Sequence, residues 1–311
     1  MSSANLHLRD LIAHEASLQS ETGKSSVSSL STLRSFTQPA PKVIAISGGK
    51  GGVGKTLISA NLAYSCAVLG QRTLVIDGDL GLSNLDVVMN MRPKGSIDDV
   101  LAGECDLTDV IAPYAPGLDL LPSSSGFLKV PELERKHKLI LLEQIESLDG
   151  RYDLILIDTA AGVSRTVQHW AASAGQIVIV VTPEPTSLAD GYATMKILSE
   201  SIGESCFSLV VNMVSSDSEA LEIFSKFSTV AEEFLGARVD YLGAVPTDPH
   251  VKASVRQRNL LCRHFPFSPA SVALNALAAH LSMKSDTATA KGTAQFFWRR
   301  MVNYEQGEAR C

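Results

Sequence analysis

The sequence has few of the residues that mark a secreted, metal-bound or membrane-spanning chain. Its five cysteines are odd in number and far apart, with no Cys-x-x-Cys pair for zinc, an iron–sulfur cluster or dithiol chemistry. No apolar run approaches the roughly 18 residues that a bilayer-spanning helix needs. None of the seven histidines has His-x-x-x-His spacing, and the serine run at 123–125 lacks a G-x-S-x-G pattern. We expect a protein of the reducing cytosol that is neither secreted nor transmembrane.

The chain also has fewer basic than acidic residues: it contains 27 Lys and Arg against 33 Asp and Glu, which gives a net charge of −6. That sign argues against direct DNA binding over a whole surface, although a local basic patch stays open. With 311 residues, 45% of them hydrophobic, the chain can bury a full core. We expect one large domain with tails.

The chain divides by composition into four parts. Residues 1–41 hold ten serines between Ser2 and Ser35 and are expected to form a flexible arm. A short helix over about 6–19 could pack on a partner there, or the arm could be a frayed terminus without a role. Residues 42–282 are the expected folded domain, 283–293 a polar linker and 294–305 a separate helix.

Short β-branched runs alternate with helical stretches along the domain, which is typical of buried parallel strands with crossover helices. The expected strands are Val43–Ser47, Thr73–Asp77, Leu154–Asp158, Ile177–Thr182, Ser208–Asn212 and Val239–Gly243. The expected helices are Thr56–Leu69, Glu132–Ser147, Val163–Ser173, Leu188–Ser201, Ser216–Leu235 and Pro269–Leu281. This order predicts an α/β fold, a doubly wound and mostly parallel sheet with helices on both faces. Ligands of such sheets bind beyond the C-terminal strand ends.

A glycine-rich loop joins the first expected strand to the first helix. Residues 49–56 fit the pattern G-x-x-x-x-G-K-[ST], which cradles phosphates with backbone N–H groups and a helix N-terminus. Lys55 would reach the outer phosphates and the Thr56 hydroxyl would ligate Mg²⁺. The alternative is a tight glycine turn that binds nothing. We expect ATP or ADP with Mg²⁺, held by Gly49, Gly51, Gly52, Val53, Gly54, Lys55, Thr56 and Leu57.

Acidic and amide side chains follow the expected strands. Asp77 and Asp158 end two strands, and carboxylate oxygens suit Mg²⁺, so the predicted metal ligands are Thr56, Asp77 and Asp158. Asn212 is a candidate to hydrogen-bond adenine. Pro246 and Asp248 lie in a turn that could border the base. The alternative for each is an ordinary strand end or turn.

The loop sequence Lys50-Gly-Gly-x-Gly-Lys-Thr resembles the deviant Walker A class of ATPases. The resemblance implies that Lys50 reaches the phosphates of a second subunit in an ATP-bound dimer, although a solvated loop lysine is the alternative. It also implies slow ATP hydrolysis, with Asp79 orienting the attacking water beside Lys50 and Lys55. Residues 158–162 resemble a second switch that moves with the γ-phosphate.

Two further stretches resemble one branch of this class. Residues 79–86 are similar to the MinD and FlhG branch, and residues 182–192 with 158–162 resemble the FlhG (FleN) flagellar number regulators more than MinD. The resemblance covers about 42–282. It implies control of flagellar number or placement, with FlhF GTPase, flagellar C-ring proteins or a transcription regulator as candidate partners. The arm lacks the Asp-Gln-Ala-x-x-Leu-Arg element with which such proteins stimulate FlhF.

The C-terminal segment is amphipathic at helical spacing. Aromatic and apolar side chains share one face and paired arginines lie on the other, which suits a bilayer interface. The expected membrane-contacting residues are Phe297, Trp298, Arg299, Arg300, Met301 and Val302. The alternative is a last helix docked on the domain.

These expectations combine into a homodimeric ATPase on the cytoplasmic face of the inner membrane, with a cell pole as a candidate location. A MinD-like division-site selector, a ParA-like DNA or cargo positioner and a scaffold without hydrolysis are the alternatives.

Overall fold

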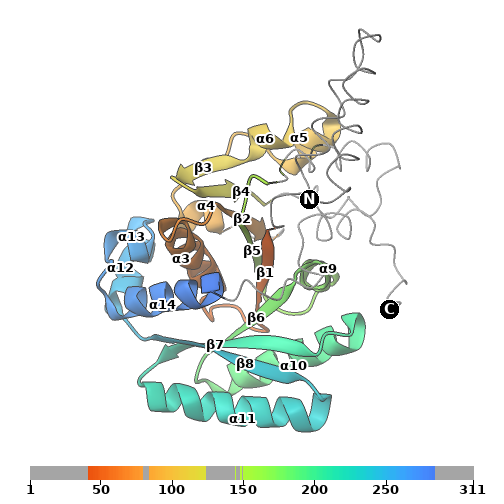
Figure 1. Cartoon of the computed structure of the whole chain (residues 1–311), viewed down its shortest axis with the longest axis vertical. Helices are drawn as coiled ribbons and strands as arrows, with labels where there is room; N and C mark the ends of the chain where they lie inside the picture. Colours follow the sequence, from red (N-terminus) through yellow and green to blue (C-terminus); the bar gives the residue numbers. More distant parts are fainter. Residues whose placement is uncertain (1–40, 80–83, 124–143, 145–147, 149, 284–311) are drawn as a thin grey trace, which may run out of the picture. The chain divides into compact units, whose positions relative to one another are not determined.

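The centre of the domain is an eight-stranded sheet, shown in Figure 1, with the strand order β3-β4-β2-β5-β1-β6-β7-β8. The computed structural model describes residues 41–79, 84–123, 144, 148 and 150–283, all within the second of the chain's two units, which begins at residue 39. The strands are β1 (Lys42–Ser47), β2 (Thr73–Gly78), β3 (Ala112–Ala115), β4 (Leu118–Leu121), β5 (Leu154–Thr159), β6 (Gln176–Val181), β7 (Cys206–Val214) and β8 (Arg238–Pro246). All pairs are parallel except β3 with β4. The predicted fold class is confirmed.

Helices cover both faces of this sheet. They are α3 (Lys55–Val68), α4 (Leu85–Val88), α5 (Ile97–Ala102), α6 (Leu107–Val110), α9 (Arg165–Ser173), α10 (Pro185–Ile202), α11 (Asp217–Leu235), α12 (Pro249–Gln257), α13 (Leu261–His264) and α14 (Pro269–Met283). Alternate strand residues enter opposite cores: Ile44 and Ile46 pack with α3, α13 and α14, whereas Val43 and Ala45 pack with α5, α6 and α9. This period-two alternation is what a sheet buried on both sides requires.

The predicted strands agree with β1, β2, β5, β6, β7 and β8, and five predicted helices agree with α3, α9, α10, α11 and α14. The start expected for α10 was three residues late, because Pro185 begins that helix at a position where a missing N–H costs nothing. The hairpin β3–β4 and the helices α4, α5, α6, α12 and α13 were missed. Each of these helices and each strand of the hairpin is nine residues or shorter and carries little periodic signal.

Several predictions fall outside the described residues. They are the N-terminal helix at 6–19, nearly all of the helix at 132–147, and the segment 294–305 with its membrane-contacting residues. Within the described ranges, no helix is both long enough and apolar enough to span a membrane.

Candidate nucleotide-binding site

The glycine loop leaves the buried end of β1 and enters α3 at Lys55. Gly52 and Gly54 have φ angles of 83° and 93°, a left-handed conformation that glycine adopts without the clash of a side chain. Gly49 is fixed for another reason: a Cβ there would overlap the backbone carbonyl of Asp190 in α10. The loop is therefore held between the sheet and α10. Among the described residues beyond the chain neighbours, no atom lies within 4 Å of the position that a Cβ would take at Gly51 or Gly52, so this part of the loop is open.

Lys55 lies at the N-terminus of α3 and is 7% exposed. Its Nζ donates a hydrogen bond to the carbonyl of Lys50 at 3.3 Å, inside the loop. Burial lowers the pKa of the Lys55 ammonium, and the carboxylates of Asp158 and Asp79 oppose that shift. A buried cation at the start of a helix that follows a glycine loop fits a polyphosphate, because the ligand's negative charge is attracted by the ammonium and by the helix N-terminus.

Asp158 is the penultimate residue of β5 and lies beside Asp77 of β2 in the parallel register. Its carboxylate is buried and accepts hydrogen bonds from Ser59 Oγ, at 2.9 Å, and from the Thr56 hydroxyl. Burial raises the pKa of Asp158 to about 7, against the opposing effect of both hydroxyls and Lys55, while Asp77 adds to the rise. Hydroxyl and carboxylate oxygens are the donors that Mg²⁺ prefers, so this group fits the ion.

Asp77 also holds the segment that follows β2. Its Oδ1 accepts from the backbone N–H of Asp79 at 3.1 Å, and its Oδ2 accepts from the N–H groups of Asn84 and Leu85 at 3.3 Å. One carboxylate thus ties both described ends of the 79–84 segment to the tip of β2. This placement supports Asp77 as a holder of that segment, with Asp79 half-buried beside it.

Asn212 lies against the glycine loop from the end of β7. Its Nδ2 donates to the carbonyl of Val53 at 2.8 Å, and its Oδ1 accepts from the N–H of Met213 at 2.9 Å. Met213 has a φ of 62°, which is strained for a bulky residue, at an irregularity in the β7–β8 pairing. A Cβ on Gly54 would overlap Asn212 Nδ2, so the amide and the loop are packed together. The amide therefore braces the glycine loop, and the predicted adenine contact stays a prediction.

The two residues expected beside the base differ from that expectation in detail. Pro246 is the last residue of β8. The Asp248 side chain is fully buried and accepts from the N–H groups of His250, at 2.8 Å, and Ala270, at 3.1 Å. These bonds cap α12 and fix the start of α14. The carboxylate of Asp248 is therefore used inside the protein, and a contact of this turn with the base stays a prediction.

Lys50 makes a contact that sequence reasoning missed. Its Nζ lies 2.8 Å from Glu184 Oε2 and 3.0 Å from Thr186 Oγ1, both at the start of α10. We call Lys50, Glu184 and Thr186 the P-loop latch. Glu184 and Thr186 belong to the Pro-Glu-Pro-Thr-Ser run, whose only sequence signal was its family resemblance.

Ser59, one helical turn after Lys55, was also missed, although Lys-Thr-x-x-Ser spacing places it on the same helix face.

Fold and site together define a P-loop nucleoside triphosphatase: a doubly wound sheet, a glycine loop into a helix, a buried lysine and an acid on the adjacent strand. The AAA domain family matches residues 41–204.

Known relatives narrow this class. The antiactivator FleN of Pseudomonas aeruginosa is 35% identical over 263 residues, which cover 85% of this chain and 94% of FleN. The flagellum site-determining protein YlxH of Helicobacter pylori is 34% identical over 267 residues, 85% of this chain and 90% of YlxH. The septum site-determining protein MinD of Pyrococcus horikoshii, solved with Mg-ADP, superposes with a TM-score of 0.62 at 25% identity, over 79% of this chain and 98% of MinD. The chain belongs to the FleN (FlhG) family of MinD/ParA-type P-loop ATPases, and its activity is ATP hydrolysis.

Proposed function

We propose that this ATPase is a nucleotide-operated dimer that regulates flagellar number or placement from the membrane surface. The observation that supports dimerisation is the P-loop latch, in which Lys50 contacts Glu184 and Thr186. Lys50 extends away from the Lys55 ammonium toward α10, and its side chain is 40% exposed. A lysine at the loop surface is available to the phosphates of a second copy, whereas Lys55 remains with its own nucleotide.

Each side chain of the site has its own role in the proposed ATP hydrolysis. Backbone N–H groups of 51–55 and the Lys55 ammonium bind and orient the phosphates. The Thr56 hydroxyl and Asp158, the latter through water, would hold Mg²⁺, which supplies charge neutralisation when bound. The Asp79 carboxylate accepts a hydrogen bond from the attacking water and so orients that water toward the phosphate. Lys50 of the other copy completes the positive charge around the phosphates, so closure and hydrolysis depend on one another.

The flagellar output is supported by the names of two relatives, an antiactivator and a flagellum site-determining protein. FlhF GTPase, C-ring proteins and a transcription regulator are the proposed partners. We propose that residues 297–302 of two copies together bind the cytoplasmic face of the inner membrane, because paired weak anchors gain effective concentration. Location at a cell pole is part of this proposal.

A MinD-like role in division-site selection is the second candidate, favoured by the similarity to MinD structures. Counting flagella and measuring cell length in a deletion strain separates the two. A changed flagellar number at normal cell length supports flagellar regulation, and minicells with normal flagellation support the alternative.

The membrane proposal needs its own test. A fluorescent fusion with residues 292–311 deleted should lose membrane localisation while the purified chain keeps its ATPase activity. Unchanged localisation of the deleted fusion would contradict the proposed anchor.

A further inference from the structure

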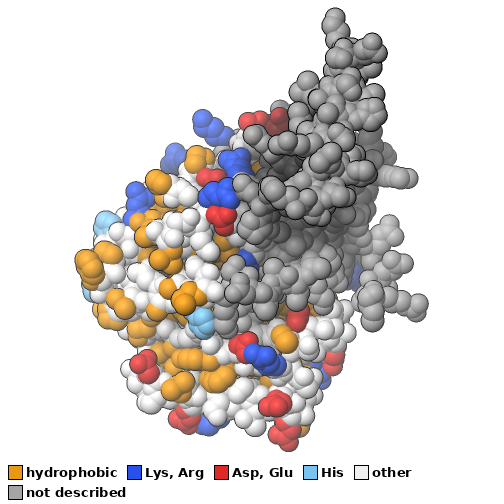
Figure 2. All heavy atoms as spheres, viewed as in Figure 1, with side chains coloured by type: hydrophobic (Ala, Val, Ile, Leu, Met, Phe, Trp, Pro, Cys, Tyr) orange, Lys and Arg blue, Asp and Glu red, His pale blue; other side chains and the backbone are white. Residues whose placement is uncertain are grey.

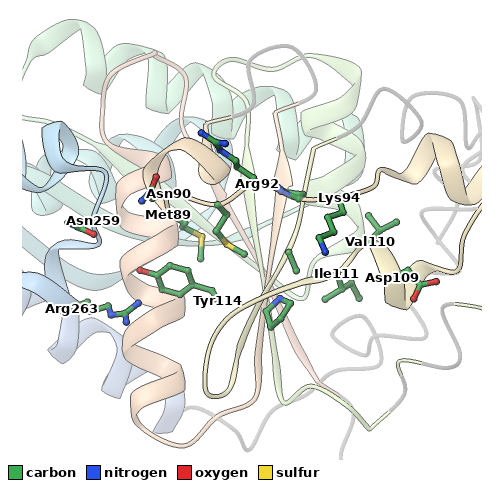
Figure 3. A pocket seen from close by; sticks show the side chains of 14 residues that line it. Met89, Asn90, Arg92, Lys94, Asp109, Val110, Ile111, Tyr114, Asn259 and Arg263 are labelled. Carbon is green, nitrogen blue, oxygen red and sulfur yellow. The ribbon is translucent and has the colours of Figure 1, made fainter.

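A cavity of about 660 Å³ lies outside the nucleotide site, between residues 89–94, which follow α4, and the edge strand β3. Figure 3 shows Arg263 and Asn259 at one end and Lys94, Asp109 and Ile111 toward the other. A volume of this size accommodates several side chains of a bound ligand. None of the proposed nucleotide-binding residues lines it.

The charged side chains of this cavity are mostly positive. Arg92, Lys94 and Arg263 line it, all three exposed, and Asp109 is the carboxylate among the lining residues. Asp109 accepts from the backbone N–H of Asp106 at 3.2 Å and so is used to cap α6. Within the described part of the chain, no carboxylate forms an ion pair with Arg92 or Lys94. Figure 2 shows Lys and Arg side chains gathering over the part of the surface near β3.

The surface between these charges is apolar. Met89 and Ile111 are 2% and 5% exposed and form its floor, while Met91 and Tyr114 are half-buried. Arg263 lies over the Tyr114 ring, 5.4 Å from its centroid, which fixes the aromatic ring at that end. Methionine side chains adapt to differently shaped apolar ligands. The cavity therefore offers an apolar contact flanked by cations on both sides.

We propose that this cavity binds an acidic segment of a partner protein, with an apolar side chain on the floor and carboxylates on either side. The cations are spread from Arg263 to Lys94 and do not converge on one point, as they would around a single phosphate. A chain with spaced carboxylates matches that spread. The net charge of −6 makes this cationic surface a local exception, which favours an acidic partner over a basic one.

The cavity is connected to the proposed nucleotide switch, and this step rests on the proposed function. Asp77 binds the N–H groups of Asn84 and Leu85, which begin α4. Met91 N–H returns to the carbonyl of Asp86 at 2.8 Å, with Asn90 between them in a left-handed conformation at φ 53°. These hydrogen bonds join the start of α4 to Met91, so we expect a nucleotide-dependent shift of Asp77 and Asp79 to reach the cavity wall at 91–94. Partner affinity therefore depends on the bound nucleotide.

The test is selection from a random 12-residue peptide display library on the full-length chain with ADP. The peptides selected are then measured by fluorescence anisotropy. We expect sequences with two or more Asp or Glu around an apolar residue, and at least tenfold weaker binding to the Arg92→Glu/Lys94→Glu variant. The matched control, Lys252→Glu/Arg256→Glu, reverses two exposed charges on α12 and should change affinity less than twofold.

Selected peptides that are basic, or acidic peptides that bind both charge-reversal variants equally, would overturn the proposal. If no acidic peptide is selected, and phosphatidylglycerol vesicles or inorganic phosphate bind the wild type but not the Arg92→Glu/Lys94→Glu variant, the proposal is overturned in favour of another anion. Equal affinity with ADP and with a non-hydrolysable ATP analogue would overturn the connection to the switch. Because Lys50→Ala removes dimerisation in the proposed function and leaves the cavity intact, peptide binding to that variant separates the two proposals.

Discussion

The buried carboxyl of Asp158 gives the stability of the nucleotide-free protein a distinctive pH dependence. Burial raises its pKa to about 7, whereas in the unfolded chain it has its ordinary value near 3.8. The folded state therefore keeps a proton that the unfolded state releases, and stability falls as pH rises from about 4 to about 7. From pH 5 to pH 8 the loss corresponds to about two pKa units, or about 2 to 3 kcal/mol.

Replacement by Asn removes the titration while keeping a group that can bond the Ser59 hydroxyl. We predict that Asp158→Asn becomes more stable than wild type with rising pH, and that its advantage grows by about 2 to 3 kcal/mol between pH 5 and pH 8. The assay is urea unfolding of full-length protein in EDTA without nucleotide, at four pH values, with free energies compared between the two proteins.

Asp153→Asn is the matched control. Its carboxylate bonds Arg72 at 2.6 Å, and this hydrogen bond lowers the pKa of Asp153. The stability that the ionised Asp153 carboxylate contributes is present above its unfolded pKa and is lost only as pH falls below about 4. The difference in unfolding free energy between Asp153→Asn and wild type therefore stays constant between pH 5 and pH 8. If the Asp158→Asn difference is equally flat, the carboxyl is ionised in the folded protein and the reasoning fails.

Three further predictions follow from the site. Glu184→Gln breaks the exposed ion pair that holds Lys50 within its own copy, which is worth about 0.5 to 1 kcal/mol in each of the two copies. ATP-dependent dimers should therefore be about 5 to 30 times tighter when measured by sedimentation. The control Glu200→Gln, on the same helix, should leave dimer affinity unchanged. Gly49→Ala should lower the thermal midpoint by several degrees because its Cβ meets the backbone of α10, and Gly51→Ala, with open space around it, should leave the midpoint unchanged; equal effects would contradict the loop geometry. Met213→Asn should stabilise the chain by about 0.5 to 1 kcal/mol and Met213→Val should destabilise it, in denaturant unfolding, because asparagine tolerates a left-handed backbone and a β-branched residue does not.

The sequence predicted the parts of this protein that depend on strong local patterns. Buried strands such as β5 show as unbroken β-branched runs, and the glycine loop carries its chemistry within eight residues. The edge hairpin β3–β4 was missed because its four-residue strands contain Pro113 and alternate weakly.

The contacts of the site depend on tertiary structure and were not predictable. Glu184 is 134 residues from Lys50, and nothing local indicates that they pair. Asp248 looked like a ligand-facing turn residue, but its bond to the N–H of Ala270 closes a contact across 22 residues. The strain at Met213 likewise comes from the pairing of β7 with β8.

The central claim is that ATP bound at the glycine loop brings two copies together through Lys50. The direct measurement is sedimentation velocity of the full chain with Mg²⁺ and a non-hydrolysable ATP analogue, beside parallel titration calorimetry. Wild type should bind the analogue and double its mass from 33.2 kDa, while Lys50→Ala should bind it and stay at the mass of one chain. A wild-type protein that binds the analogue and remains a single chain, or a Lys50→Ala variant that dimerises equally well, would contradict the account.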